Sequence, residues 1–178
     1  MSLGYACALR EVSVIVRTQR KRRPKVRFCL VFERESLSIP AMRQVLGDTL
    51  RRLGVNEDSV ADILLAATEA CTNVVLHAGH SVSVYEIAAT VSRGACRVEV
   101  TDAGGGCPRP RLRVPHARRG RWASAHGLAE SGRGFTIMRA CVDDVRLRSS
   151  PGRGTRVVLD KRIHWEAPPA RPALSPGP

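Results

Sequence analysis

Aromatic side chains make up only 4% of this 178-residue sequence. Proteins that bind single-stranded nucleic acid without sequence preference depend on a series of aromatic side chains on which the bases stack. The scarcity of such residues therefore argues against direct nucleic-acid binding, although the formal net charge is +13. A basic tail could still attract nucleic acid or an acidic protein without specificity.

Zinc-binding motifs and long hydrophobic runs are also absent. The six cysteines form no Cys-x-x-Cys pair and no Cys/His cluster with the spacing of zinc ligands. No apolar run approaches the length of a membrane span, and the N-terminus has no apolar core followed by a small-residue cleavage site. We therefore expect a soluble cytoplasmic protein with no membrane contact and with reduced cysteines.

The positive charge is concentrated in two segments. Residues 1–24 carry six Lys/Arg and one acid, and residues 104–133 carry seven Arg and one acid, so together they hold 11 of the 13 excess charges. Residues 164–178 contain five prolines and are typical of a disordered end. We predict a basic N-terminal tail at 1–24, which could contribute one edge strand, a single domain at 25–163, and a Pro-rich C-terminal tail at 164–178.

Hydrophobic periodicity predicts a mixed order of elements within the domain. A long stretch without periodicity, 107–131, is expected to be a loop that acts as a lid. The predicted strands are 26–33, 81–91, 95–101, 143–149 and 154–159, and the predicted helices are 38–53, with Ser38 as its N-cap, about 56–78, and 135–141. This order predicts an α+β two-layer sandwich, in which a mixed, mostly antiparallel sheet carries its helices on one face.

The second of these helices carries the first candidate site. Its apolar residues recur at intervals of three and four, as in one buried stripe. Glu69 and Asn73 are four residues apart and share a face, with His77 one turn further on. A carboxylate there could accept a proton and an amide oxygen could help to bind Mg²⁺, although most such pairs are solvated helix surface.

Two glycine motifs follow. Asp102 ends a predicted strand and precedes Gly104 and Gly106, where an Asp could accept a hydrogen bond from an exocyclic amine and the glycines could let the backbone approach a flat ring. Gly132 and Gly134 come just before a helix, whose free N–H groups favour phosphate. Each motif alone is weak, because glycines mark turns far more often than nucleotide sites. The Rossmann fingerprint and the Walker A motif are both absent.

The order of these motifs is more specific than any one of them. A Glu-x-x-x-Asn helix, a strand ending in Asp-x-Gly-x-Gly, a long loop, Gly-x-Gly entering a helix, and Gly154-Thr155 opening the last strand resemble the Bergerat-type ATP-binding fold of gyrase, histidine kinases and the mismatch-repair ATPases. Within that superfamily, "EACTNVVLHA", "VTDAGGG" and "GLAESGRGFTIMRACVDDVRLRSSPGRGTRVVL" resemble the anti-sigma-factor serine kinases. The resemblance covers residues 25–161.

The resemblance implies a role for each motif residue. Glu69 would be the catalytic base toward the attacking serine of a protein substrate, and Asn73 would bind Mg²⁺ and phosphate oxygens. The expected nucleotide-binding residues are Asp102 at the adenine amine, Gly104 and Gly106 around the base, Gly132, Arg133 and Gly134 at the phosphates, and Thr155 at the adenine end. His77 is given no catalytic role.

Two features depart from the family pattern. Glu130 stands where many relatives carry a basic residue, and a carboxylate there would repel phosphates unless it points away. The predicted lid is also longer and richer in arginine than is usual. Both features bear on how efficiently phosphate would be transferred.

The resemblance implies an ATP- and Mg²⁺-dependent serine kinase that is also an anti-sigma factor. Its expected partners are a sigma factor and a STAS-type anti-anti-sigma protein, and relatives suggest a homodimer. The alternative is a nucleotide-dependent module that sequesters its partner without turnover. Both hypotheses use the same pocket residues, so the sequence does not separate them.

Overall fold

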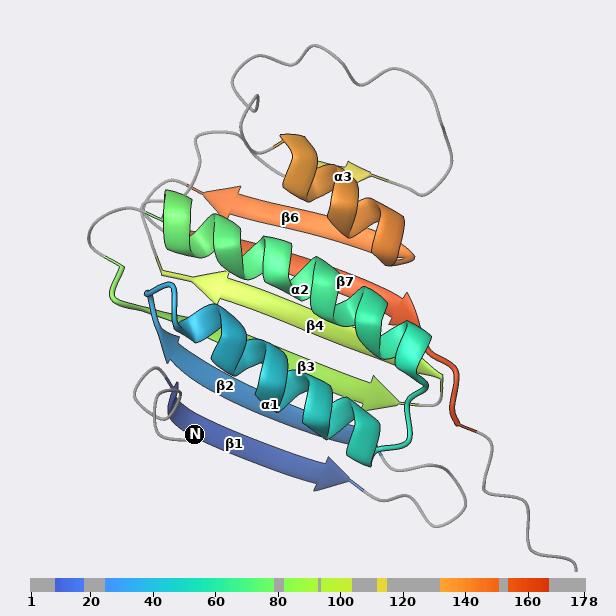
Figure 1. The fold of residues 1–178 in the computed structure, drawn as a ribbon. Coiled ribbons are helices and arrows are strands. Elements are labelled where there is room, and N and C mark those ends of the chain that lie inside the picture. Colours follow the sequence, from blue (N-terminus) through green and yellow to red (C-terminus); the bar gives the residue numbers. More distant parts are fainter. Residues whose placement is uncertain are drawn as a thin grey trace, which may run out of the picture.

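The computed structural model describes residues 9–17, 25–78, 82–92, 94–103, 112–114, 132–150 and 154–166. Within these residues the helices lie on one side of a twisted sheet, as Figure 1 shows. In chain order the elements are β1 (Leu9–Arg17), β2 (Lys25–Glu33), α1 (Ser38–Arg52), α2 (Glu57–His77), β3 (Val84–Ser92), β4 (Ala95–Asp102), β5 (Leu112–Val114), α3 (Gly132–Cys141), β6 (Asp144–Ser150) and β7 (Gly154–Arg162).

In the described part of the chain the sheet has seven strands in the order β1-β2-β3-β4-β7-β6-β5, and every neighbouring pair is antiparallel. The expected α+β two-layer sandwich is confirmed. Neither the strand order nor the place of β7 between β4 and β6 follows from hydrophobic periodicity. That place brings the start of β7 beside the end of β4, where Thr155 pairs with Asp102.

The core lies between the helices and one face of the sheet. Alternate residues of β2 and β4 point into it, as period-2 alternation requires, and they include Phe28, Leu30 and Phe32 of β2. The opposite face of the sheet carries charged side chains in cross-strand pairs, such as Arg97 with Asp160. The helices therefore cover one face, and the other is solvated.

Helix α2 begins where its sequence provides a cap. The Asn56 side chain accepts a hydrogen bond from the Ser59 amide at 3.2 Å, and Glu57 and Asp58 lie in the first turn, where the helix dipole favours negative charge. By length and composition alone this helix could cross a membrane, contrary to our expectation that no run approached that length. Half of its most apolar stretch is buried inside the domain, so its apolar character also serves core packing.

Two local predictions were wrong. Ser38 is the first residue of α1 rather than its cap, because its hydroxyl donates to the Glu35 carbonyl and accepts from the Tyr85 hydroxyl. The segment 107–131, expected to lack regular structure, contains the short strand β5, which pairs with β6. Three residues are too few to give a periodic pattern, so only the sheet edge reveals this strand.

The structure adds elements at both ends of the predicted domain. The run at 12–16, expected in a tail or an edge strand, is the edge strand: β1 pairs with β2 along nearly its whole length. Residues 164–166, assigned to the disordered end, bond to the α1–α2 connection: Val55 forms a bridge with Trp165, and the Glu166 amide donates to the Gly54 carbonyl. The remaining residues of both tails lie outside the described chain.

Candidate functional site

The site begins with the face of α2 that meets the start of α3. Glu69 and Asn73 are half-buried, one turn apart on α2. An added Cβ atom at Gly134 of α3 would lie 2.8 Å from Oε2 of Glu69 and 3.8 Å from both Oδ1 and Nδ2 of Asn73. The first turn of α3 thus lies directly against the two polar side chains. His77 is exposed at the end of α2.

Only glycine at position 134 leaves the Glu69 carboxylate where it lies. A distance of 2.8 Å is shorter than real Cβ atoms tolerate, so any larger residue would displace the Glu69 carboxylate. Gly132 is the first residue of α3, and Arg133 beside it is exposed. Because the first N–H groups of a helix have no intrahelical partner, this turn presents donors next to Glu69 and Asn73.

A second group of predicted residues lies where β4 meets β7. Asp102 is the last residue of β4 and is only 5% exposed. It pairs with Thr155, so both side chains lie on the face of the sheet that the helices cover, like the buried Val100 of β4. The Thr155 hydroxyl lies 3.0 Å from the hydroxyl of Ser149 on β6.

Gly154 brings β7 close to the end of β4. It has a φ of +79°, and a Cβ atom there would lie 2.0 Å from the carbonyl oxygen of Asp102. Neither a side chain nor an ordinary backbone conformation is therefore tolerated at this position. The glycine lets the first residues of β7 approach the Asp102 backbone.

The predicted site residues thus fall into two described groups on the helix-covered side of the sheet. One consists of Glu69, Asn73 and Gly134, and the other of Asp102 and Thr155. Helix α2 contacts both β4 and β7, which carry the second group. Gly104 and Gly106, predicted to shape the base pocket, lie outside the described residues.

A series of hydrogen bonds links buried polar side chains of α2, β3 and α1, and it was not predicted from the sequence. The Cys71 thiol is hydrogen-bonded with Tyr85, the Tyr85 hydroxyl donates to Ser38 at 2.8 Å, and the Ser38 hydroxyl donates to the Glu35 carbonyl. Burial raises the pKa of Cys71 to about 12 and also raises that of Tyr85, so both remain protonated at neutral pH. Tyr85 pairs with Asp102 across β3 and β4, so this series of hydrogen bonds connects α2 to β3, the strand that lies beside Asp102.

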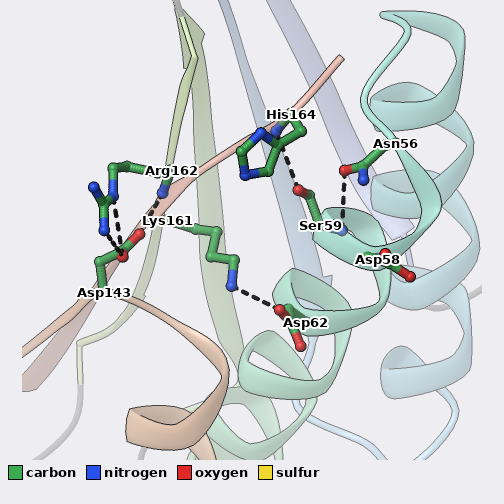
Figure 2. A pocket seen from close by; sticks show the side chains of 8 residues that line it. All are labelled: Asn56, Asp58, Ser59, Asp62, Asp143, Lys161, Arg162 and His164. Atoms are coloured by element: carbon green, nitrogen blue, oxygen red, sulfur yellow. Dashed lines mark hydrogen bonds and ion pairs between the residues drawn. The ribbon is translucent and has the colours of Figure 1, made fainter. Parts of the chain in front are cut away.

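A pocket of about 460 Å³ lies at the opposite end of α2 (Figure 2). Its charged side chains are largely paired with one another: Lys161 with Asp62, and Arg162 with Asp143. It is lined by Asn56, Asp58, Ser59, Asp62, Asp143, Lys161, Arg162 and His164. None of these is a predicted site residue, and Asp62 precedes Glu69 by seven residues, or about 10 Å of helix. The pocket is therefore distinct from the candidate site.

This chain is similar to known proteins. A family described as "Histidine kinase-like ATPase domain" matches residues 32–161. The anti-sigma F factor of Halalkalibacterium halodurans is 30% identical over 136 residues, which span 75% of this chain and 90% of that protein. The anti-sigma F factor of Clostridium acetobutylicum is 28% identical over 107 residues, which span 60% of this chain and 72% of that protein.

A solved structure shares the fold. The RsbU and RsbW domains of a Mycobacterium tuberculosis protein superpose on 78% of this chain with a TM-score of 0.54 and 20% identity. This chain spans 33% of that longer chain. The matched family segment contains α1, α2 and α3 and all of the predicted site residues, whereas β1 lies before it.

Proposed function

This chain belongs to the histidine kinase-like ATPase domain family, and we propose that it is an ATP-binding anti-sigma factor and a serine kinase of an anti-anti-sigma partner. The observation that carries the proposal is the contact of Gly134 with Glu69 and Asn73. It brings a proton acceptor, an amide ligand and the free N–H groups of a helix start to one place. A proton acceptor, a metal ligand and donors to the phosphates are parts that recur in enzymes that transfer phosphate to a hydroxyl.

The nucleotide-binding residues divide between the two groups of the site. The carboxylate of Asp102 accepts a hydrogen bond from the adenine amine, and Thr155 lies beside it on β7, with Gly104 and Gly106 completing the base pocket. The low exposure of Asp102 supports this role, because a hydrogen bond to a desolvated carboxylate discriminates strongly between partners.

The phosphates are bound at the start of α3. The N–H groups near Gly132 and Gly134 donate to phosphate oxygens, and exposed Arg133 adds positive charge. Asn73 provides an amide oxygen to Mg²⁺, which when bound neutralises charge on the phosphates. The half-buried position of Asn73 against Gly134 fits an amide ligand at the phosphate end of the site.

Glu69 acts as the general base. Its carboxylate takes the proton from the serine hydroxyl as the hydroxyl oxygen bonds to the γ-phosphorus and the bond from that phosphorus to ADP breaks. The position of Glu69 supports this role, because its Oε2 atom faces the first turn of α3, which is the proposed phosphate-binding segment. The chain contributes mainly positioning and charge stabilisation.

The partners follow from the same assignment. We propose a sigma factor and a STAS-type anti-anti-sigma protein as the proteins bound, a homodimer as the assembly, and the cytoplasm as the location. Direct contact with nucleic acid or a membrane is not part of this function.

The decisive experiment identifies the partners and then measures transfer. Proteins that co-purify with the full chain would be identified, and the candidate anti-anti-sigma protein incubated with the chain, labelled ATP and Mg²⁺. Label on a serine of that protein is the expected result. If the chain binds ATP and this partner tightly but transfers no label, it is a sequestering module and the kinase assignment is wrong.

A further inference from the structure

The ammonium group of Lys161 joins three elements of the domain. Its Nζ lies 2.6 Å from Oδ2 of Asp62 on α2 and donates to the carbonyl of Cys141, the last residue of α3, at 2.7 Å. Figure 2 shows the Lys161 side chain reaching from β7 toward α2. Lys161 pairs with the buried Cys96, so it belongs to the face of the sheet that the helices cover. One side chain therefore contacts both helices of the candidate site.

The carbonyl that Lys161 binds is a helix terminus. The last carbonyls of a helix have no intrahelical partner and carry the negative end of the helix dipole, so a cation there is stabilising. The Lys161 side chain is 21% exposed and Asp62 is 43% exposed. Because Cys141 is buried, the bond between Lys161 and its carbonyl is better shielded from water than the ion pair with the more exposed Asp62.

Two of the contacts that bring α2 and α3 together are spaced equally along both helices. At one end Gly134 meets Glu69, and at the other end Lys161 links Cys141 to Asp62. Gly134 and Cys141 are seven residues apart, as are Asp62 and Glu69, which is about 10 Å along each helix. The helices run in opposite directions at this contact, so the two points act together with the apolar packing of the shared core to set how α3 lies along α2.

We propose that Lys161 is a positioning residue for the nucleotide site, a role that rests on the proposed function. It holds the C-terminal end of α3 against α2, so that the first turn of α3 stays within reach of Glu69 and Asn73. Lys161 touches neither nucleotide nor substrate. The phosphate-binding N–H groups depend on it because α3 is short, with ten residues, and a shift at one end moves the other.

The test compares three variants of the full chain. Lys161→Met removes both polar contacts, Lys161→Arg keeps a cation that can reach both oxygens, and Arg97→Met removes an ion pair with Asp160 on the opposite face of the sheet. ADP-Mg²⁺ affinity is measured by calorimetry, and hydrogen exchange of the α3 amides without nucleotide. Lys161→Met should weaken binding roughly three- to thirtyfold, the usual range for coupling through a contact network, and accelerate α3 exchange.

Lys161→Arg should recover most of the affinity, and Arg97→Met should leave both readouts as in wild type. Wild-type affinity and unchanged α3 exchange in Lys161→Met would overturn the positioning role, whatever happens to its melting temperature. If Lys161→Met does not fold, Asp62→Asn removes the ionic contact alone and should show the same changes at smaller size. If the wild type binds no nucleotide, the proposed function fails, while α3 exchange still tests the contact.

Discussion

The Glu69 carboxylate and the Cα of Gly134 approach so closely that one methyl group does not fit between them: a Cβ atom at Gly134 would lie 2.8 Å from Oε2 of Glu69. The atom met is the end of a flexible side chain, so the carboxylate can move aside while the backbone stays in place. The absence of a side chain at Gly134 thus determines where the Glu69 carboxylate lies, and filling that space should have little effect on the fold.

Gly134→Ala should therefore separate activity from stability. The free energy of unfolding should stay within about 1 kcal/mol of wild type, because alanine favours helix by about that amount and offsets the crowding. Phosphotransfer should fall, by up to about a hundredfold if the carboxylate moves by 1 Å. Thermal unfolding and label transfer measure the two effects.

The matched control is Gly47→Ala in α1, where the new Cβ would meet Nη1 of Arg51 at 2.9 Å and Cδ1 of Leu64 on α2 at 3.1 Å, neither of which belongs to a site residue. This variant should transfer phosphate normally. Wild-type transfer by Gly134→Ala would show that the Glu69 position does not matter for the reaction.

Asp102→Asn should weaken nucleotide binding. The amide either presents a donor to the adenine amine or loses the charge, and a hydrogen bond that involves a charged group contributes about 1.5–3 kcal/mol. ATP affinity measured by calorimetry should fall by roughly ten- to a hundredfold. Glu99→Gln on the same strand, which pairs with Arg156 on the solvated face, is the control. Equal affinities for the two variants would remove Asp102 from the site.

Gly154→Ala and Gly94→Ala should differ in their effect on stability although both glycines have positive φ. At Gly94 the nearest atom to an added Cβ is 3.8 Å away, so only the backbone preference is lost, which costs about 1–2 kcal/mol. At Gly154 the Cβ would also overlap the Asp102 carbonyl, and backbone cannot move aside as a side chain can. Chemical denaturation should therefore show a clearly larger loss for Gly154→Ala.

The sequence predicted what depends on local pattern. Apolar periodicity predicted α2 and its start near residue 56, whereas the cap that the Asn56 side chain provides was found only in the structure. Ser38 was misassigned because its hydroxyl is bound by Tyr85, which is 47 residues away in the chain. Contacts between elements distant in sequence, such as Lys161 with Asp62, leave no periodic signal, so they become visible only when the fold is known.

The same distinction applies to the site. The Glu-x-x-x-Asn spacing predicted that Glu69 and Asn73 share a helix face, and the family order supplied their roles. The contact of both with Gly134 is a tertiary feature that spacing cannot give. The roles themselves stay predictions, because they depend on a nucleotide and a partner.

Removal of residues 1–17 should destabilise the domain without changing the nucleotide site. β1 pairs with β2 through backbone hydrogen bonds, so its loss exposes the edge of β2. β2 and β3 separate β1 from β4, which carries Asp102. The melting temperature should fall by several degrees and aggregation should increase, while ATP affinity stays as in wild type when measured well below the melting temperature. Unchanged melting would mean that β1 is a dispensable addition to the edge.

Glu69 and Asn73 share one face of α2, yet their variants should fail differently. Glu69→Gln keeps the size and hydrogen bonding of the side chain but cannot accept a proton. It should bind ATP-Mg²⁺ nearly as wild type and lose about two to four orders of magnitude in phosphotransfer, the usual contribution of a general base.

Asn73→Ala removes the amide oxygen proposed for Mg²⁺, so nucleotide binding should weaken, and by more in the presence of Mg²⁺ than in EDTA. Helix stability should change little in either variant, because both side chains are half-buried at the edge of the core. Calorimetric titrations with and without Mg²⁺, run beside label transfer to the anti-anti-sigma partner, measure both effects. If the two residues merely occupied a helix surface, both variants would bind ATP and transfer phosphate as the wild type does; a loss of transfer with retained binding in Glu69→Gln is the result that assigns the proton to its carboxylate.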